Sequence, residues 1–136
     1  YRACDALGLE IPEEYVREGV YHDPDRCAEL TRELLQLPEP PTCILMPDDF
    51  SSIGGGNAIR RMDLRFPEDV SAAGYDGIQL ASVTNPAMTT YRQDTAALGK
   101  TAAAKLIELI EKPRTALVDR ILIPGKLVEG GSVRAI

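Results

Sequence analysis

The chain has 136 residues, of which 44% are hydrophobic and 26% charged, and its formal net charge is −6 at pH 7. This length allows one domain with a hydrophobic core of its own and excludes two domains. Lysine and arginine are scattered rather than clustered, so the chain offers a phosphate backbone no basic surface, and we expect that it does not itself bind DNA.

The cysteine, histidine and hydropathy patterns argue against a metalloprotein and against a membrane protein. Cys4, Cys27 and Cys43 lack the CxxC spacing of metal sites, and the chain has one histidine, His22, which we interpret as a solvated loop residue. We therefore expect no metal and no cofactor, and we expect the three thiols to be buried in apolar surroundings. No apolar run approaches the roughly 20 residues of a membrane span, so we expect no membrane contact and a reducing, cytoplasmic location.

The first residues are typical of a helix end. Residues 1–7 have the composition of the last turns of a helix, and Gly8 suits the left-handed position that follows one. Neither an N-cap residue nor a strand precedes these turns, so we interpret the chain as the C-terminal part of a longer protein. A short strand is then predicted over Tyr15–Val20.

The first complete helix is predicted from Pro24 to Leu37. Asp23 has the side chain of an N-cap residue, and proline is favoured at the first helical position. One face of this helix is apolar at ordinary core spacing, and it carries Cys27, Leu30, Leu34 and Leu37. The following prolines end the helix.

A strand over Thr42–Met46 and a helix of about three turns come next. The helix begins after two acids, and Asp49 is predicted to be its N-cap, while Asp48 follows the strand. Three glycines, residues 54–56, fall inside this helix. No lysine or hydroxyl residue follows them at P-loop spacing, so they indicate the close approach of another helix or subunit rather than a phosphate site.

The second strand, Val70–Tyr75, also ends at an acid, Asp76. Strands that alternate with helices favour a parallel sheet, in which the carboxyl ends of the strands meet at one edge. We therefore expect Asp48 and Asp76 to lie side by side at that edge.

The remainder of the chain is predicted to contain a loop, a long helix and two strands. Residues 77–88 form the loop, and the helix runs from Asp94, its cap, to Lys112. Its apolar stripe is wide, so we expect the helix to pack onto the chain's own sheet or onto a second chain by swapping. The strands are predicted over Leu117–Ile123 and Lys126–Glu129.

Several short motifs occur together in a characteristic order and spacing. They are Pro41-Thr42-x-Ile44-Leu45-x-x-Asp48-Asp49, residues 66–71 (Phe-Pro-Glu-Asp-Val-Ser), Gly74-Tyr75-Asp76, residues 86–94 and Leu98-Gly99. From Gly8 to Ser132 the chain resembles the effector-binding core of lactose-repressor-type (LacI/GalR family) bacterial transcriptional regulators. It departs from the family pattern at Asp48, usually Asn, at Gly77, often Asp, and at Gly130, often Arg.

The resemblance implies an α/β fold, a three-layer parallel-sheet subdomain of the periplasmic-binding-protein-like type that lacks most of the N-terminal subdomain. Residues 1–89 and 125–136 would belong to the C-terminal subdomain. Residues 90–124 would supply elements of the N-terminal one. Because one wall of the cleft is then largely absent, we expect weak or no effector binding by this chain alone.

The resemblance also implies the ligand contacts. Asp48, Asp76 and Gln93 match residues that hydrogen-bond effector hydroxyls, and Tyr21 matches an aromatic residue that stacks on the ligand. An acid in place of Asn at 48 would suit an effector rich in hydroxyl donors or carrying positive charge. Two alternatives remain: Asp76 as the cap of the next turn, and Tyr21 as a half-buried ring.

A homodimer is implied as well. The pairing surface would come from the helix after Asp49 and from the 77–88 loop, with contacts from Ser51, Ile53, Gly54, Gln79, Leu80, Val83 and Thr84. The alternative is a solvated loop that packs Ile78 and Leu80 inward.

The resulting hypothesis is a sensor for a small-molecule effector, such as a sugar, that reaches operator DNA only through a missing N-terminal headpiece. Two alternatives are a periplasmic-type sugar-binding protein and a Mg²⁺-dependent phosphoryl-transfer enzyme using Asp48 and Asp76. We expect no enzyme, because no cation is arranged near these acids to clamp a phosphate.

Overall fold

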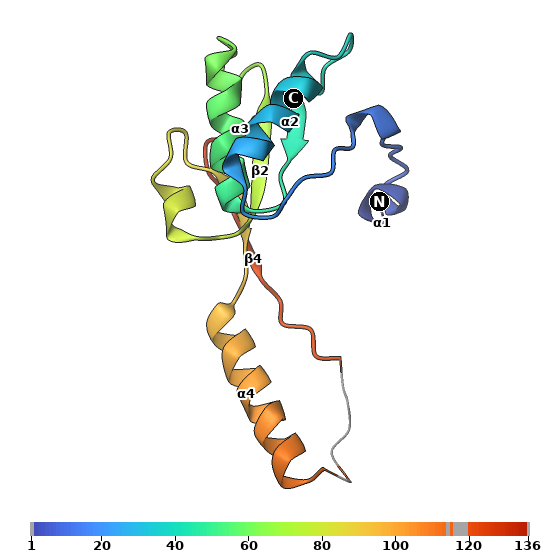
Figure 1. Ribbon diagram of the computed structural model, residues 1–136, viewed down its shortest axis with the longest axis vertical. Coiled ribbons are helices and arrows are strands. Elements are labelled where there is room, and N and C mark those ends of the chain that lie inside the picture. The colour runs from blue at the N-terminus through green and yellow to red at the C-terminus, as the bar shows by residue number, and fades with distance from the viewer. Residues whose placement is uncertain (1, 114, 116–119, 136) are drawn as a thin grey trace.

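Four short strands form the sheet of the molecule, for which the computed structural model describes residues 2–113, 115 and 120–135. The strands lie in the order β1 (Cys43–Leu45), β2 (Ser71–Asp76), β3 (Thr89–Arg92) and β4 (Lys126–Val128). The first three are parallel, and β4 runs antiparallel to β3. The predicted α/β fold with a mostly parallel sheet is thus confirmed (Figure 1).

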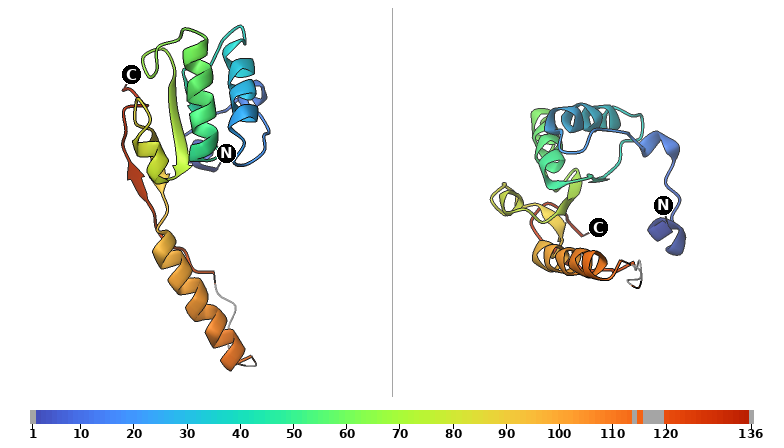
Figure 2. Two further views of the ribbon diagram at one scale, coloured as in Figure 1. Left: turned by 60° about the vertical axis from the view of Figure 1, so that its left-hand side comes forward. Right: turned by 60° about the horizontal axis from the view of Figure 1, so that its bottom comes forward.

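Two helices, α2 (Pro24–Leu35) and α3 (Asp49–Arg61), pack together on one face of the sheet (Figures 1 and 2). The core between the two helices and the sheet holds Leu34, Leu35, Ile44, Met46, Ile59, Val70, Ala72, Ala81 and Met88. The short helix η2 (Gln79–Ser82) adds Ala81 to the core, whereas α1 (Arg2–Ala6) and η1 (Glu13–Tyr15) bury no residue, and α1 lies apart from the sheet (Figure 1). None of the described helices is long and apolar enough to cross a membrane.

The opposite face of the sheet exposes apolar side chains. Leu45, Tyr75, Tyr91 and Leu127 are between 38% and 80% exposed, and the register of the strands places them on the same side. The described residues therefore supply two of the three layers expected for this fold.

The helix boundaries depend on side-chain caps that the sequence partly predicts. The carboxylate of Asp23 accepts a hydrogen bond from the Arg26 amide at the start of α2, as predicted, whereas the helix ends two residues before Leu37. At α3 the predicted cap is wrong: Asp48 caps the helix and Asp49 is its first residue. The choice between adjacent acids depends on which one has extended backbone, and here that residue is Asp48.

The strand predicted over Tyr15–Val20 is wrong. Only a turn of 3₁₀ helix, η1, forms there, and the residues after Tyr15 pair with no strand. The Arg17 guanidinium donates to the carbonyls of Glu14 and Val16 instead, which keeps the segment folded on itself. An alternating pattern makes a strand only where a neighbouring strand supplies hydrogen-bond partners.

All three thiols were predicted to be buried, and none is fully buried. Cys43 is exposed because it lies on the uncovered face of β1, while Cys4 and Cys27 are half-buried. Burial raises the pKa of the Cys27 thiol, which lies beside Thr31.

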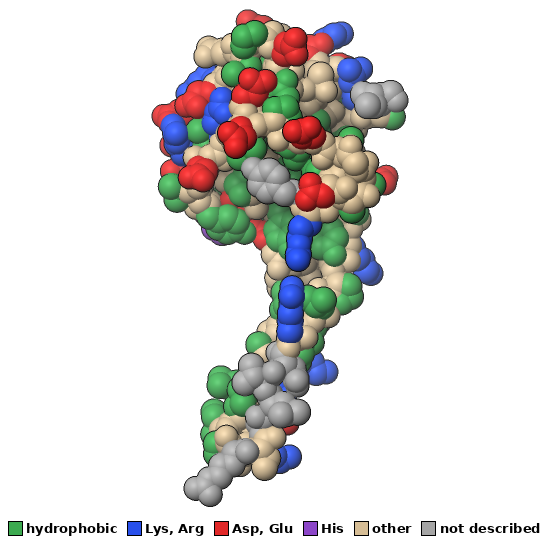
Figure 3. Space-filling view, turned by 90° about the vertical axis from the view of Figure 1, so that its right-hand side faces the viewer, with side chains coloured by type: hydrophobic (Ala, Val, Ile, Leu, Met, Phe, Trp, Pro, Cys, Tyr) green, Lys and Arg blue, Asp and Glu red, His purple; other side chains and the backbone are tan. Residues whose placement is uncertain are grey.

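The long helix α4 (Thr95–Glu111) projects away from the body and has no buried residue (Figures 1 and 2). Asp94 caps it, as predicted. It does not pack onto the chain's own sheet, so this half of the expectation is wrong, while packing onto a second chain by swapping stays a prediction. Hydrophobic side chains are visible along the projection (Figure 3). Leu106, Ile107 and Ile110 are more than half exposed.

The return from α4 to the sheet is only partly described. Residues 117–119 of the predicted strand Leu117–Ile123 lie outside the described residues, and 120–123 are irregular. The final strand, β4, is confirmed and ends one residue earlier than predicted.

After β4, the buried Ser132 fastens the tail to the sheet. Its hydroxyl donates to the Ala72 carbonyl over 2.7 Å and accepts from the Thr89 amide over 2.7 Å. These bonds connect the C-terminal segment to both β2 and β3, a role for which the sequence carries no recognisable signal.

Two of the three glycines of α3, Gly54 and Gly55, explain how closely it packs against α2 and the end of β1. A Cβ at Gly54 would overlap the Pro24 carbonyl, and one at Gly55 would overlap the Met46 side chain. The predicted close approach of another helix is therefore confirmed. By contrast, a Cβ at Gly99 on α4 would meet nothing within 4 Å.

These two environments predict opposite effects of the same substitution. Gly99→Ala should stabilise this chain by about 0.5–1 kcal/mol, the ordinary gain in helix propensity. Gly54→Ala should destabilise it by about 1–3 kcal/mol, because the added methyl forces α2 and α3 apart. Urea unfolding followed by circular dichroism measures both, and a stabilising Gly54→Ala would contradict the packing described here.

Candidate functional site

Asp76 lies at the carboxyl end of β2 and is the centre of the site. The Tyr21 hydroxyl donates to its Oδ2 over 2.7 Å, and the Gln93 amide donates to its Oδ1 over 2.6 Å. The structure thus brings together three of the four predicted ligand-binding residues. Asp76 does not cap the following turn, because the N-cap of η2 is Ile78, which makes no side-chain hydrogen bond.

Asp48, the fourth predicted ligand contact, is fully buried. Its Oδ1 accepts from the Ser51 amide over 2.9 Å, and its Oδ2 accepts from the Ser51 hydroxyl over 2.6 Å and from the His22 amide over 3.0 Å. Burial acts to raise the pKa of Asp48, but the bonds from Ser51 and His22 outweigh it and hold this pKa below its ordinary value. In this conformation the carboxylate has no surface with which to touch a ligand.

The two acids nevertheless lie at one edge of the sheet, as predicted. Adjacent residues connect them, because Tyr21 binds Asp76 through its hydroxyl while His22 binds Asp48 through its backbone. The His22 Nε2 atom lies 3.8 Å from the Asp76 Oδ2 atom. The turn that carries Tyr21 and His22 therefore spans the gap between the ends of β1 and β2.

Rings form a wall beside Asp76. The His22 and Tyr21 rings stack with their centroids 4.3 Å apart, and the centroid of the Phe50 ring lies 5.4 Å from that of His22. All three are exposed. Sequence reasoning missed His22 and Phe50, since these two rings meet only when α3 and the 20–23 turn come together.

Asp49 secures the loop on the other side of Asp76. Its Oδ2 accepts from the Ile78 amide over 2.8 Å, so α3 holds the residues that follow β2. Its Oδ1 has no hydrogen-bond partner within the described part of the chain. The carboxylate lies against Gly74, where a Cβ would overlap both it and Ser52.

The exposed groups suit a neutral polar molecule with an apolar ring face. Carboxylate and amide groups hydrogen-bond hydroxyls, while aromatic rings cover the C–H surface of a ring. The arrangement suits a Mg²⁺ ion poorly, because both carboxylate oxygens of Asp48 already accept hydrogen bonds from protein donors. No group of three or more His, Cys, Asp or Glu able to hold a metal occurs among residues 2–113, 115 and 120–135.

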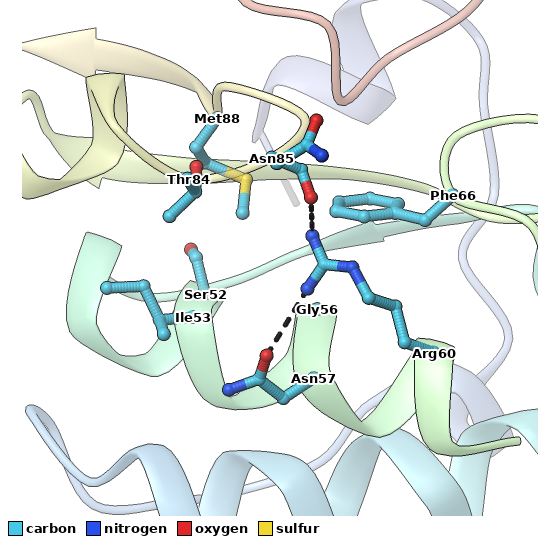
Figure 4. A pocket seen from close by; sticks show the side chains of 9 residues that line it. All are labelled: Ser52, Ile53, Gly56, Asn57, Arg60, Phe66, Thr84, Asn85 and Met88. Carbon is cyan, nitrogen blue, oxygen red and sulfur yellow. Dashed lines mark hydrogen bonds between the residues drawn. The ribbon is translucent and has the colours of Figure 1, made fainter.

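A second hollow lies on the side of α3 that faces η2. This cavity of about 350 Å³ is lined by residues from α3, the 66 loop and the 84–88 loop (Figure 4). The Arg60 guanidinium crosses it, donating to Asn57 and to the Asn85 carbonyl and lying 5.4 Å from the centroid of the Phe66 ring.

The predicted dimer residues divide into two groups around this hollow. Ser51 and Gly54 are buried within the chain, Gly54 against Pro24 of α2, so their assignment as dimer contacts stays a prediction that this single chain does not support with exposed surface. Ile53 and Thr84 line the hollow. Gln79, Leu80 and Val83 are exposed on and just after η2, and Ile78 is half-buried.

The hydrogen bond to Asp76 raises the pKa of Tyr21 to about 12. In Asp76→Asn the acceptor loses its charge and the hydrogen bond from Tyr21 becomes a weaker, neutral one, so this pKa should fall toward the ordinary value of 10.0. Absorbance titration, with Tyr21→Phe subtracted to isolate the one phenol, measures the change. Asp69→Asn, far from Tyr21, is the control, and an unchanged pKa in Asp76→Asn would contradict the Tyr21 to Asp76 bond.

Comparisons with known proteins agree with this fold. Residues 1–133 match the family described as a periplasmic binding protein-like domain. The HTH-type transcriptional repressor PurR of Escherichia coli O139:H28 is 31% identical over 137 residues, covering 98% of this chain and 40% of PurR. The chain therefore spans less than half the length of the curated relatives that it matches.

Solved structures are similar throughout the chain. The complex of the transcriptional regulator CelR with cellobiose superposes with a TM-score of 0.87 at 29% identity, over 96% of this chain and 39% of CelR. A putative LacI regulator from Bacillus cereus subsp. cytotoxis gives 0.91 at 24% identity, over 99% of this chain and 47% of that one. Since the family match spans nearly every residue, the chain belongs to the family of periplasmic-binding-protein-like domains and is homologous to the LacI-type transcriptional regulators.

Proposed function

We propose that this chain is part of the effector-sensing domain of a LacI-type transcriptional regulator and that its effector is a small hydroxylated molecule such as a sugar. The observation that carries the proposal is the cluster of Asp76, Tyr21 and Gln93 at the strand ends, beside exposed rings. The named relatives support it, since PurR is a repressor and CelR was solved with cellobiose. These relatives are regulators rather than enzymes.

Binding would exchange internal hydrogen bonds for bonds to the effector. Asp76 is 15% exposed and accepts from Tyr21 and Gln93, and each of its oxygens has a further lone pair for a ligand hydroxyl. The Tyr21 ring, 53% exposed, offers the apolar surface against which a sugar ring packs. Asp48 would contribute indirectly, because it is buried.

Signal transmission would depend on two lobes. Residues 1–89 and 125–136 would form one lobe, and residues 90–124, including α4, would join the other. An effector in the cleft stabilises one relative orientation of the lobes and so shifts the population of the two states. In a homodimer whose pairing face includes Ile53, Leu80 and Val83, that shift would change the spacing of the DNA-binding headpieces in the cytoplasm.

Asp76→Ala in the full-length parent protein should abolish the response to effector while sparing operator binding. The substitution removes the acceptor for ligand hydroxyls but leaves the DNA-contacting part untouched. Operator gel shifts with and without effector measure both properties, and Asp69→Ala serves as a surface control. A full response in Asp76→Ala would rule out Asp76 as a ligand contact.

The isolated 136-residue chain should bind effectors weakly, because α4 (Thr95–Glu111) projects away from the body and leaves one side of the site open. Isothermal titration with a saccharide panel that includes cellobiose tests this, with the full-length protein as the control. Micromolar affinity for the isolated chain would show that one lobe suffices.

A further inference from the structure

We propose that His22 is a specificity-determining contact of the effector and that Asp48 is the positioning residue that holds it in place, an inference that rests on the function proposed above. The sequence neighbours of His22 do not indicate this role. The position of His22 in the fold does, because its imidazole lies among the exposed aromatic rings, near the carboxylate of Asp76.

The backbone of His22 adopts a conformation that needs support. Its φ of +59° lies in the left-handed region, which costs an L-residue about 1–2 kcal/mol. The hydrogen bond from its amide to the buried Asp48 Oδ2, 3.0 Å long, stabilises this turn. The backbone is thereby fixed from inside the protein, while the imidazole remains 53% exposed at the surface.

The His22 imidazole is placed to hydrogen-bond a hydroxyl group of the effector. Its Nε2 lies 3.8 Å from Asp76 Oδ2, which is too long for a direct hydrogen bond. A hydroxyl between them can donate to the carboxylate and accept from the imidazole N–H, whereas an ammonium or ether group can do only one of these. The pair therefore favours a free hydroxyl over an O-methyl or amino substituent at that position of the effector.

The same geometry explains why an acid stands at position 48. Oδ2 accepts from both the His22 amide and the Ser51 hydroxyl while Oδ1 accepts from the Ser51 amide. An asparagine has one acceptor oxygen, so its NH₂ group would face the backbone N–H of either His22 or Ser51, and two N–H donors cannot bond each other. The negative charge therefore serves the 20–23 turn, and it requires no positive charge on the effector.

Asp48→Asn separates this role from a general role in folding. Asparagine caps helices as well as aspartate does, so α3 keeps its N-cap. Without effector, the His22 imidazole signals in a ¹H–¹³C NMR spectrum of the full-length protein should lose the ring-current shift that stacking on Tyr21 produces. His22→Gln assigns these signals by difference. Asp94→Asn, which alters the equivalent cap of α4, should leave them unchanged.

A double-mutant cycle tests the contact itself. For the saccharide that binds the full-length protein most tightly in a panel including cellobiose, His22→Gln and Asp48→Asn should each raise Kd about tenfold, the effect of one polar contact. The Kd of the double variant should equal, within about threefold, that of the weaker-binding single variant, because both substitutions remove the same interaction. O-methyl derivatives of this saccharide then identify the hydroxyl that His22 contacts. It is the one whose methylation removes the difference in Kd between the wild type and His22→Gln.

Each outcome has a distinct meaning. An unshifted imidazole spectrum in Asp48→Asn, or fully additive losses in the cycle, overturns the positioning role. An unchanged Kd in His22→Gln overturns the contact while leaving the proposed function intact. If no saccharide binds the wild-type protein, the contact and the proposed sugar function both fail, and the spectrum still decides whether Asp48 holds the turn.

Discussion

Two adjacent buried carboxylates at the start of α3 hold the candidate site together. Asp48 binds the backbone of the turn before α2, and Asp49 binds the backbone of the loop after β2. These two loops carry Tyr21, His22 and Asp76, the groups that a ligand would meet. Because α3 is in turn packed against α2 through glycines that allow close contact, the position of the site is determined by the core. Hydrogen bonds to buried charged groups are among the stronger contributions to such an arrangement.

The fold and the location of the site could be predicted because they follow from strong regularities. Parallel strands end at one edge, so acids after β1 and β2 had to be neighbours, and Asp23 and Asp94 cap the helices that they precede. The division of roles between Asp48 and Asp49 could not be predicted, since it depends on the backbone angles of one residue. The role of His22 could not be predicted either, because Asp48, Phe50 and Asp76 meet it only in the folded chain. The segment at Tyr15–Val20 has the pattern of a strand without a neighbour to pair with.

Two apolar surfaces of the described residues are uncovered, the helix α4 and the open face of the sheet. The chain spans 40% of the length of PurR. Helix propensity and a correct cap were enough to predict α4 as a helix. Its packing could not be predicted, because an apolar stripe favours burial without specifying the surface against which the helix packs.

The body and α4 are joined by only two passages of chain, β3 leading out and β4 leading back. Both strands belong to the four-stranded sheet, since β3 pairs with β2 as well as with β4. The amide of Gly125 donates to the Tyr91 hydroxyl over 2.9 Å at the point where the two passages separate. With 17 residues, α4 is about 25 Å long. Any small change in its angle to the sheet would therefore displace its far end by several ångströms.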